Sequence, residues 1–215
     1  MKLGVFDSGI GGEAVAAALQ VTFPQAEILT VNDREHVPYG NRSREEVTRL
    51  TDSAIQPLLE GDCDVIILAC NTATALAIDT LRKQYPLQKF IGIEPMVKTA
   101  ASLTKSNKIV VCATPSTLSS ERYQHLLDKY TENIEVTEPD CSEWAYLIEN
   151  NTINRSHIEQ PIIDACASGA DVIVLGCTHY HWIKDLIVEI AQGKAIVIEP
   201  SEAIGRRVQQ LLEKS

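Results

Sequence analysis

The chain has 215 residues, of which 45% are hydrophobic and 22% are charged, and its formal net charge at pH 7 is −10. This is the composition of a globular protein with one large or two small domains, and its acidity without a basic cluster argues against a nucleic-acid binder. The longest apolar runs reach about six residues, far short of the roughly twenty that cross a bilayer, so a membrane span is excluded.

The N-terminus and the cysteines indicate the compartment. The chain begins MKLGVFDSG, with Asp7 where a signal peptide would carry its apolar stretch, so we expect a cytoplasmic protein. The six cysteines stand at positions 63, 70, 112, 141, 166 and 177 and contain no CxxC pair. This spacing disfavours a disulfide framework and a zinc ribbon, and no metal site is predicted. The six cysteines are therefore candidates for a function that uses free thiols.

Short apolar runs alternate with helical patterns along the chain. The predicted strands are Leu3–Phe6, Ile28–Val31, Val65–Leu68, Phe90–Ile93, Lys108–Cys112, Ile134–Val136, Val172–Leu175 and Ala195–Ile198. The predicted helices include Ala14–Gln20, Arg44–Glu60, Thr74–Gln84, Ser119–Lys129, Glu159–Ser168 and Glu202–Lys214. Most strands are continuous apolar runs, which is typical of parallel strands covered on both faces. The alternation therefore predicts an α/β fold with mainly parallel sheets.

The second half of the sequence repeats the pattern of the first. DVIILAC at 64–70 resembles DVIVLGC at 171–177, KLGVFDS at 2–8 resembles KIVVCAT at 108–114, and IGIEP at 91–95 resembles IVIEP at 196–200. Single pairs of this kind recur by chance in α/β proteins, but three pairs in one order at nearly one spacing indicate a duplication. We therefore expect two similar α/β domains, residues 1–97 and 98–200, with a C-terminal helix at 201–215 packing back on the first.

Two cysteines stand at strand ends in matched copies of this repeat. Ligands of open α/β sheets bind at the carboxyl ends of strands, and Cys70 and Cys177 each follow such an end and open into a helix. The positive end of a helix dipole should lower a thiol pKa. The neighbouring Asn71, Thr72 and Thr178 could hold a carboxylate without Lys or Arg. Two thiols on opposite sides of a small acid suit stereoinversion, in which one removes an α-proton and the other returns one.

Five segments are similar to the cofactor-independent aspartate/glutamate racemase family, and most of all to its glutamate-racemising members. They are FDSGIGG at 6–12, the stretch from Asp33 to Gly40 that ends in PYG, ACNTAT at 69–74, ATPST at 113–117 and GCTHY at 176–180. The resemblance implies two α/β domains related by a pseudo-twofold axis, with the active site in the cleft between them. It also implies cofactor-independent racemisation of L-glutamate to D-glutamate, which bacteria use for peptidoglycan.

The resemblance further implies roles for individual residues. Cys177 would deprotonate L-glutamate with help from His179, and Cys70 would deprotonate D-glutamate with help from Asp7. The substrate-contacting positions would be Ser8, Pro38, Tyr39, Gly40, Asn71, Thr72, Thr114, Thr117 and Thr178. Two further carboxylates, Asp33 and Glu149, would be secondary. No cofactor is implied, and the expected partner is the substrate glutamate, with a homodimer left open.

Some positions depart from the family pattern, and other functions stay open. Ser116 stands where Gly is usual, His181-Trp182 replace Pro-Leu after GCTHY, and Glu199-Pro200-Ser201 replace an Asp-Ser pair. The substrate could instead be aspartate or another small diacid, because one methylene changes discrimination by only about 1–3 kcal/mol. A different class is a non-catalytic relative that binds a protein such as DNA gyrase. A GxGxxA stretch at 9–14 is a weak dinucleotide signal, disfavoured by the carboxylate of Asp7 beside it.

Overall fold

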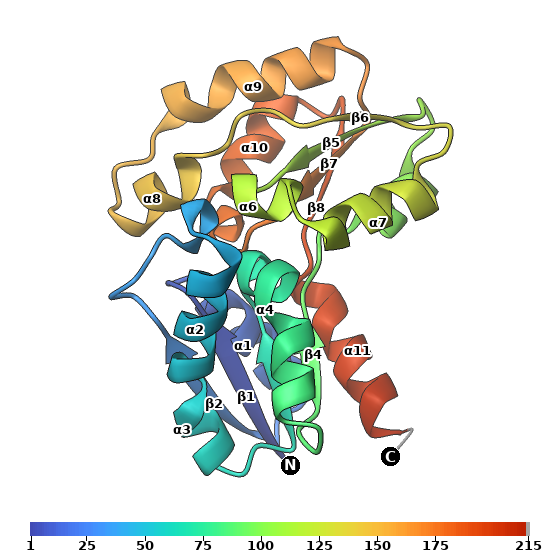
Figure 1. The fold of residues 1–215 in the computed structure, drawn as a ribbon. Coiled ribbons are helices and arrows are strands. Elements are labelled where there is room, and N and C mark those ends of the chain that lie inside the picture. The colour runs from blue at the N-terminus through green and yellow to red at the C-terminus, as the bar shows by residue number, and fades with distance from the viewer. Residues whose placement is uncertain (214–215) are drawn as a thin grey trace.

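The computed structural model describes residues 1–213, except for the side chain of Glu202, and contains two four-stranded, all-parallel sheets (Figure 1). The first sheet has the order β2-β1-β3-β4 and the second the order β6-β5-β7-β8. The strands are β1 Lys2–Asp7, β2 Glu27–Asn32, β3 Val65–Leu68, β4 Phe90–Gly92, β5 Lys108–Cys112, β6 Glu135–Thr137, β7 Val172–Leu175 and β8 Ile196–Ile198. The predicted α/β fold is confirmed, and strands with matching sequences take matching places in the two sheets.

Helices connect and cover the strands. They are α1 Gly12–Thr22, α2 Arg44–Ala54, α3 Gln56–Glu60, α4 Asn71–Gln84, α5 Val97–Leu103, α6 Pro115–Leu118, α7 Glu121–Tyr130, α8 Trp144–Glu149, α9 Arg155–Ala167, α10 Lys184–Ala191 and α11 Ser201–Leu212, with 3-10 turns η1 Tyr39–Asn41 and η2 Thr178–Ile183. The single helix predicted over 44–60 is wrong. It breaks at Ile55 because Pro57, in the first turn of α3, cannot donate a helical hydrogen bond.

Each sheet is covered by apolar side chains on both faces. Along β3, Ile66 and Leu68 point into one core cluster while Val65 and Ile67 point into another, and all four are fully buried. The strand β7 repeats this division between its own two clusters. Successive side chains of a strand alternate between faces. A continuous apolar run is therefore what a central strand of such a sheet requires.

The chain passes between the two sheets twice, after β4 and again after β8, where α11 returns to the first sheet. Ile204 and Val208 of α11 join the same apolar cluster as Leu3, Val5 and residues of α1. Figure 1 shows α11 running beside the first sheet, away from the second. Residues 214–215 of the predicted C-terminal helix lie outside the described residues. Within residues 1–213, no helix is long and apolar enough to cross a membrane.

Candidate active site

Cys70 and Cys177, one from each half of the chain, line a single small cleft between the two sheets. Each lies two residues beyond the end of its strand, β3 or β7, where the backbone turns into the following helix. The lining residues are Ser8, Val37, Pro38, Tyr39, Gly40, Cys70, Asn71, Thr72, Thr114, Ala145, Cys177, Thr178 and His179. The volume of the cleft is only about 10 Å³, which is room for about one water molecule. The halves are thus closed on one another.

The sulfur of Cys70 has uncharged hydrogen-bond donors. Cys70 is the N-cap of α4, and its Sγ accepts from the backbone N–H of Ala73 at 3.4 Å and from the Ser8 hydroxyl at 3.2 Å. Burial raises the pKa of this thiol to about 12, with the negative charge of Asp7 adding to the effect of burial. The expectation that a helix end lowers the pKa of Cys70 is wrong, because desolvation outweighs the two hydrogen bonds.

The sulfur of Cys177 lies beside a charged pair instead. Its Sγ is 3.8 Å from Nδ1 of His179, whose Nε2 is 2.9 Å from Oε2 of Glu149. Burial lowers the pKa of His179, but the contacts with Cys177 and Glu149 outweigh it and raise the pKa to about 10. Burial likewise raises the pKa of Glu149, whereas hydrogen bonds from His179, Ile10 and Arg34 bring it down to about 2. At neutral pH the pair is an imidazolium and a carboxylate. Cys177 opens into a helix as expected, which begins as the 3-10 helix η2 and continues as α10.

Asp7 ties the two halves together beneath the cleft. One carboxylate oxygen accepts from the backbone N–H of Gly9 at 2.9 Å, and the other accepts from the Thr178 hydroxyl of the second half at 2.8 Å. The residue is fully buried, and burial raises its pKa. The side chain that bonds to Asp7 is therefore that of Thr178, next to Cys177, whereas the side chain that bonds to Cys70 is that of Ser8.

The glycines after β1 allow this close approach. A Cβ on Gly9 would lie 2.5 Å from Nε2 of His179, and one on Gly11 would lie 2.4 Å from Oγ1 of Thr178. Real Cβ contacts are never this short, so any side chain at these positions would push the halves apart. The pattern that weakly suggested dinucleotide binding serves here as a contact surface between the halves.

The cleft wall also carries hydroxyls and one unpaired amide. Asn71 is buried, and neither Oδ1 nor Nδ2 of its side chain has a hydrogen-bond partner. Thr72 is bonded to Thr114 at 2.9 Å, and Thr114 to Thr117 at 3.0 Å. Buried polar groups are almost always paired, so the amide of Asn71 is available to donate and accept hydrogen bonds within the cleft. Thr117 supports Thr114 from behind and does not line the cleft.

The other predicted residues lie on or behind the wall. Pro38, Tyr39 and Gly40 line the cleft, whereas Asp33 lies behind them and accepts from the Tyr39 hydroxyl at 2.6 Å. Sequence reasoning missed the lining residues Val37 and Ala145. Ala145 precedes Glu149 by four residues on α8, and this spacing places both on one helix face. From this spacing and the prediction of Glu149, Ala145 could have been predicted as a lining residue.

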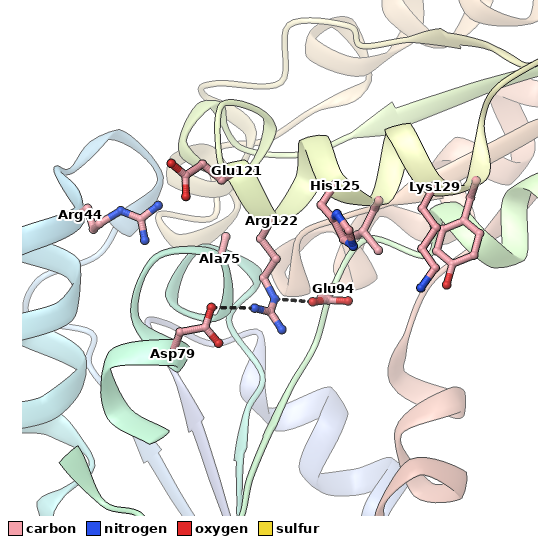
Figure 2. Close-up of a pocket in the computed structure, with 10 residues that line it drawn as sticks. Arg44, Ala75, Asp79, Glu94, Glu121, Arg122, His125 and Lys129 are labelled. Atoms are coloured by element: carbon pink, nitrogen blue, oxygen red, sulfur yellow. Dashed lines mark hydrogen bonds and ion pairs between the residues drawn. The ribbon is translucent and has the colours of Figure 1, made fainter. Parts of the chain in front are cut away.

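A larger hollow of about 440 Å³ lies elsewhere between the halves (Figure 2). At its centre Arg122 of α7 pairs with Asp79 of α4 at 3.0 Å and with Glu94, which follows β4. Arg44, Glu121, His125 and Lys129 surround this group. The hollow is an ion-paired seam that contains no thiol, so the smaller cleft is the candidate active site.

Known proteins match the chain over nearly its whole length. A family model described as Asp/Glu/Hydantoin racemase matches residues 13–204. A glutamate racemase of Pseudomonas aeruginosa (strain UCBPP-PA14) is 35% identical over 214 residues, which covers 98% of this chain and 81% of the relative.

Solved structures agree with this match. Glutamate racemase isoform RacE1 from Bacillus anthracis superposes with a TM-score of 0.85 at 28% identity, over 99% of this chain and 81% of that one. A glutamate racemase from Francisella tularensis, in complex with D-glutamate, gives a TM-score of 0.82 at 29% identity, also over 99% of this chain and 81% of that one. The chain therefore belongs to the Asp/Glu/hydantoin racemase family and is an amino-acid racemase of the glutamate racemase type.

Proposed function

We propose that this protein interconverts L- and D-glutamate in the cytoplasm by proton transfers between the substrate and two cysteines, and so supplies D-glutamate for peptidoglycan. The observation that carries the proposal is the pair of sulfurs, Cys70 and Cys177, which come from opposite halves and line one closed cleft. The relatives named glutamate racemase and the D-glutamate bound to the Francisella tularensis enzyme favour glutamate as the substrate.

In this reaction a sulfur on each face of the α-carbon handles one proton. The thiolate of Cys177 takes the α-proton of L-glutamate, and the electron pair of the broken C–H bond stays on the α-carbon. The thiol of Cys70 then gives its proton to the opposite face, which leaves Cys70 as a thiolate and the product as D-glutamate. The surroundings support these assignments, because a pKa of about 12 keeps Cys70 protonated and the His179 imidazolium stabilises negative charge on the neighbouring sulfur.

The α-carbon of an amino acid is a far weaker acid than a thiol, so the cleft must lower the barrier by positioning and by excluding water. The unpaired amide of Asn71 and the hydroxyls of Thr72 and Thr114 offer donors to the substrate carboxylate. Because a cleft of about 10 Å³ cannot admit glutamate, the halves must open for binding and close for chemistry.

Turnover in deuterated water tests the proposal. The protein is incubated with L-glutamate, D-glutamate, L-aspartate and D-aspartate in separate reactions, followed by circular dichroism and by NMR of the α-proton. We expect both glutamate antipodes to be converted, with deuterium on the α-carbon of the product. Faster turnover of aspartate would overturn the assigned substrate, and product without label would overturn the exchange through two thiols. Turnover of no diacid would favour the non-catalytic protein-binding class.

The biosynthetic role is tested separately. A bacterial strain that lacks its own glutamate racemase and depends on added D-glutamate should grow without it when it expresses this chain. Failure to grow, with active protein present in the extract, would contradict the role in peptidoglycan supply and leave the chemistry intact.

A further inference from the structure

Arg34 contacts the carboxylate that holds His179, although it does not itself line the cleft. Its Nε donates to Oε1 of Glu149 at 2.9 Å. The other oxygen, Oε2, is 2.9 Å from Nε2 of His179 and accepts from the backbone N–H of Ile10 at 3.1 Å. Arg34 follows β2 in the first half, and Glu149 ends α8 in the second. The contact therefore crosses from one half to the other.

The carboxylate of Glu149 depends on the first half for two of these three contacts. Its side chain is only 7% exposed, whereas that of Arg34 is 60% exposed and reaches it from the outside. Ile10 lies in the glycine-rich loop that packs against His179. Glu149 is therefore held on both oxygens only when the two halves are together. Opening the cleft would remove Ile10 and Arg34 from it at once.

We propose that Arg34 is a positioning residue for proton transfer at Cys177, an inference that rests on the proposed two-cysteine chemistry. By fixing Oε1 of Glu149 across the boundary between the halves, Arg34 fixes the direction of Oε2, and so the plane of the His179 ring whose Nδ1 faces the sulfur. Hydrogen bonds that orient a reacting group through a second residue are a recurring feature of active sites.

The contact serves one sulfur and not the other. Cys70 is held by Ser8 and by the backbone of Ala73, and neither of these residues touches Glu149 or Arg34. Loss of Arg34 should therefore slow the step at Cys177 and leave the step at Cys70 as it is. Glutamate antipodes are equal in free energy, so kcat/KM must fall equally in both directions. The difference between the proton transfers at Cys177 and Cys70 will appear only in the deuterium isotope effects on kcat/KM.

The experiment compares Arg34→Ala and Arg34→Lys with the unchanged protein, using L- and D-glutamate that carry deuterium on the α-carbon. For Arg34→Ala we expect kcat/KM to fall by about two- to fivefold, which is the range of an exposed ion pair. The isotope effect should rise with labelled L-glutamate, whose deuteron goes to Cys177, and should fall with labelled D-glutamate, whose deuteron goes to Cys70. Arg34→Lys keeps the charge and should recover part of the loss.

Arg155→Ala is the matched control. Arg155 is 44% exposed and pairs with Glu159 and Glu189, both in the second half, so its loss should change neither rate nor isotope effects. Equal changes in the two isotope effects of Arg34→Ala would overturn the proposal, because they would mean that Arg34 affects the proton transfers at both cysteines alike. An unchanged kcat/KM would overturn it too. Failure of the proposed function would be seen apart from these outcomes, as an absence of α-labelling in the unchanged protein.

Discussion

The two half-sites share a backbone plan but surround their sulfurs differently. Cys70 and Cys177 both follow the third strand of their half, β3 or β7, in equivalent places of two sheets with the same strand order. Around Cys70 the donors are a hydroxyl and a backbone N–H, whereas beside Cys177 lies the charged pair of His179 and Glu149. Duplication of the fold thus explains why two thiols meet. The different neighbours give the two sulfurs different surroundings: burial and the charge of Asp7 raise the pKa of Cys70, whereas a cation lies beside Cys177.

The largest expected effect comes from removing either sulfur. Cys70→Ser and Cys177→Ser should each lower the racemisation rate by about 10²- to 10⁴-fold, because a hydroxyl is a much poorer acid and base than a thiol at neutral pH. Every turnover uses both groups, so the two losses should be similar despite the different surroundings. Circular dichroism at a single wavelength measures the rate, and the full spectrum confirms the fold. Near-normal turnover in one variant would remove that half from the chemistry.

The next effect comes from separating the halves. Gly11→Ala places a Cβ within 2.4 Å of Thr178 Oγ1, so the cleft should no longer close fully, and kcat/KM should fall by about 10- to 100-fold. Gly61→Ala is the control, because the atoms that its Cβ would meet, Cδ1 of Leu29 at 2.8 Å and the backbone oxygen of Pro57 at 3.0 Å, all lie in the first half. Thermal unfolding of both variants should stay close to that of the unchanged protein. A Gly11→Ala protein with full activity would show that closure is unnecessary.

The pH dependence of stability separates the half-sites further. His179 has its pKa raised from 6.5 to about 10, so the stability it contributes is complete below pH 6.5 and is lost as the pH rises through about 10. The unfolding free energy of the unchanged protein, relative to His179→Asn, should therefore fall across this window by a few kcal/mol, at most about 5 kcal/mol. Urea unfolding at several pH values measures it. Ser8→Ala, beside Cys70, should show no such dependence there, and a flat difference for His179→Asn would contradict the charged pair.

The smallest effect concerns Ser116, one of the positions at which we expect the chain to depart from the family pattern. Its hydroxyl donates to the backbone oxygen of Gly40 at 2.6 Å, which links α6 to the loop on the opposite wall. Ser116→Ala removes this bond and should raise KM about two- to fivefold with little change in kcat. Initial rates at varied glutamate concentration measure KM and kcat separately. Ser116→Thr keeps the hydroxyl and should stay near the original KM, and a loss in kcat instead would place Ser116 nearer the chemistry.

The central strands could be predicted from the sequence because burial on both faces leaves a plain apolar run. Val65–Leu68, Lys108–Cys112 and Val172–Leu175 have the same bounds in the prediction and in the structure. The repeat predicted two similar halves, and the two sheets share one strand order. The ends of edge strands are harder to predict from the sequence, because these strands contain fewer buried apolar residues. The strand β6, for example, is shifted by one residue.

Features that depend on contact between the halves could not be predicted in the same way. The pKa of Cys70 is raised by burial, and part of that burial comes from residues of the second half across the cleft. Arg34 lies in a polar loop, and nothing in that loop points to Glu149, which is far away in sequence. The motifs predicted the candidate site residues, whereas the hydrogen-bond partners of these residues could be identified only from the structure.

The return of α11 to the first sheet has a consequence for synthesis of the chain. Ile204 and Val208 complete the apolar cover beneath Leu3 and Val5, so this cover of the first sheet needs residues about 200 positions later in the chain. The whole second sheet, residues 108–198, leaves the ribosome before that cover exists. We therefore expect the second sheet to fold before the first sheet receives its full apolar cover from α11.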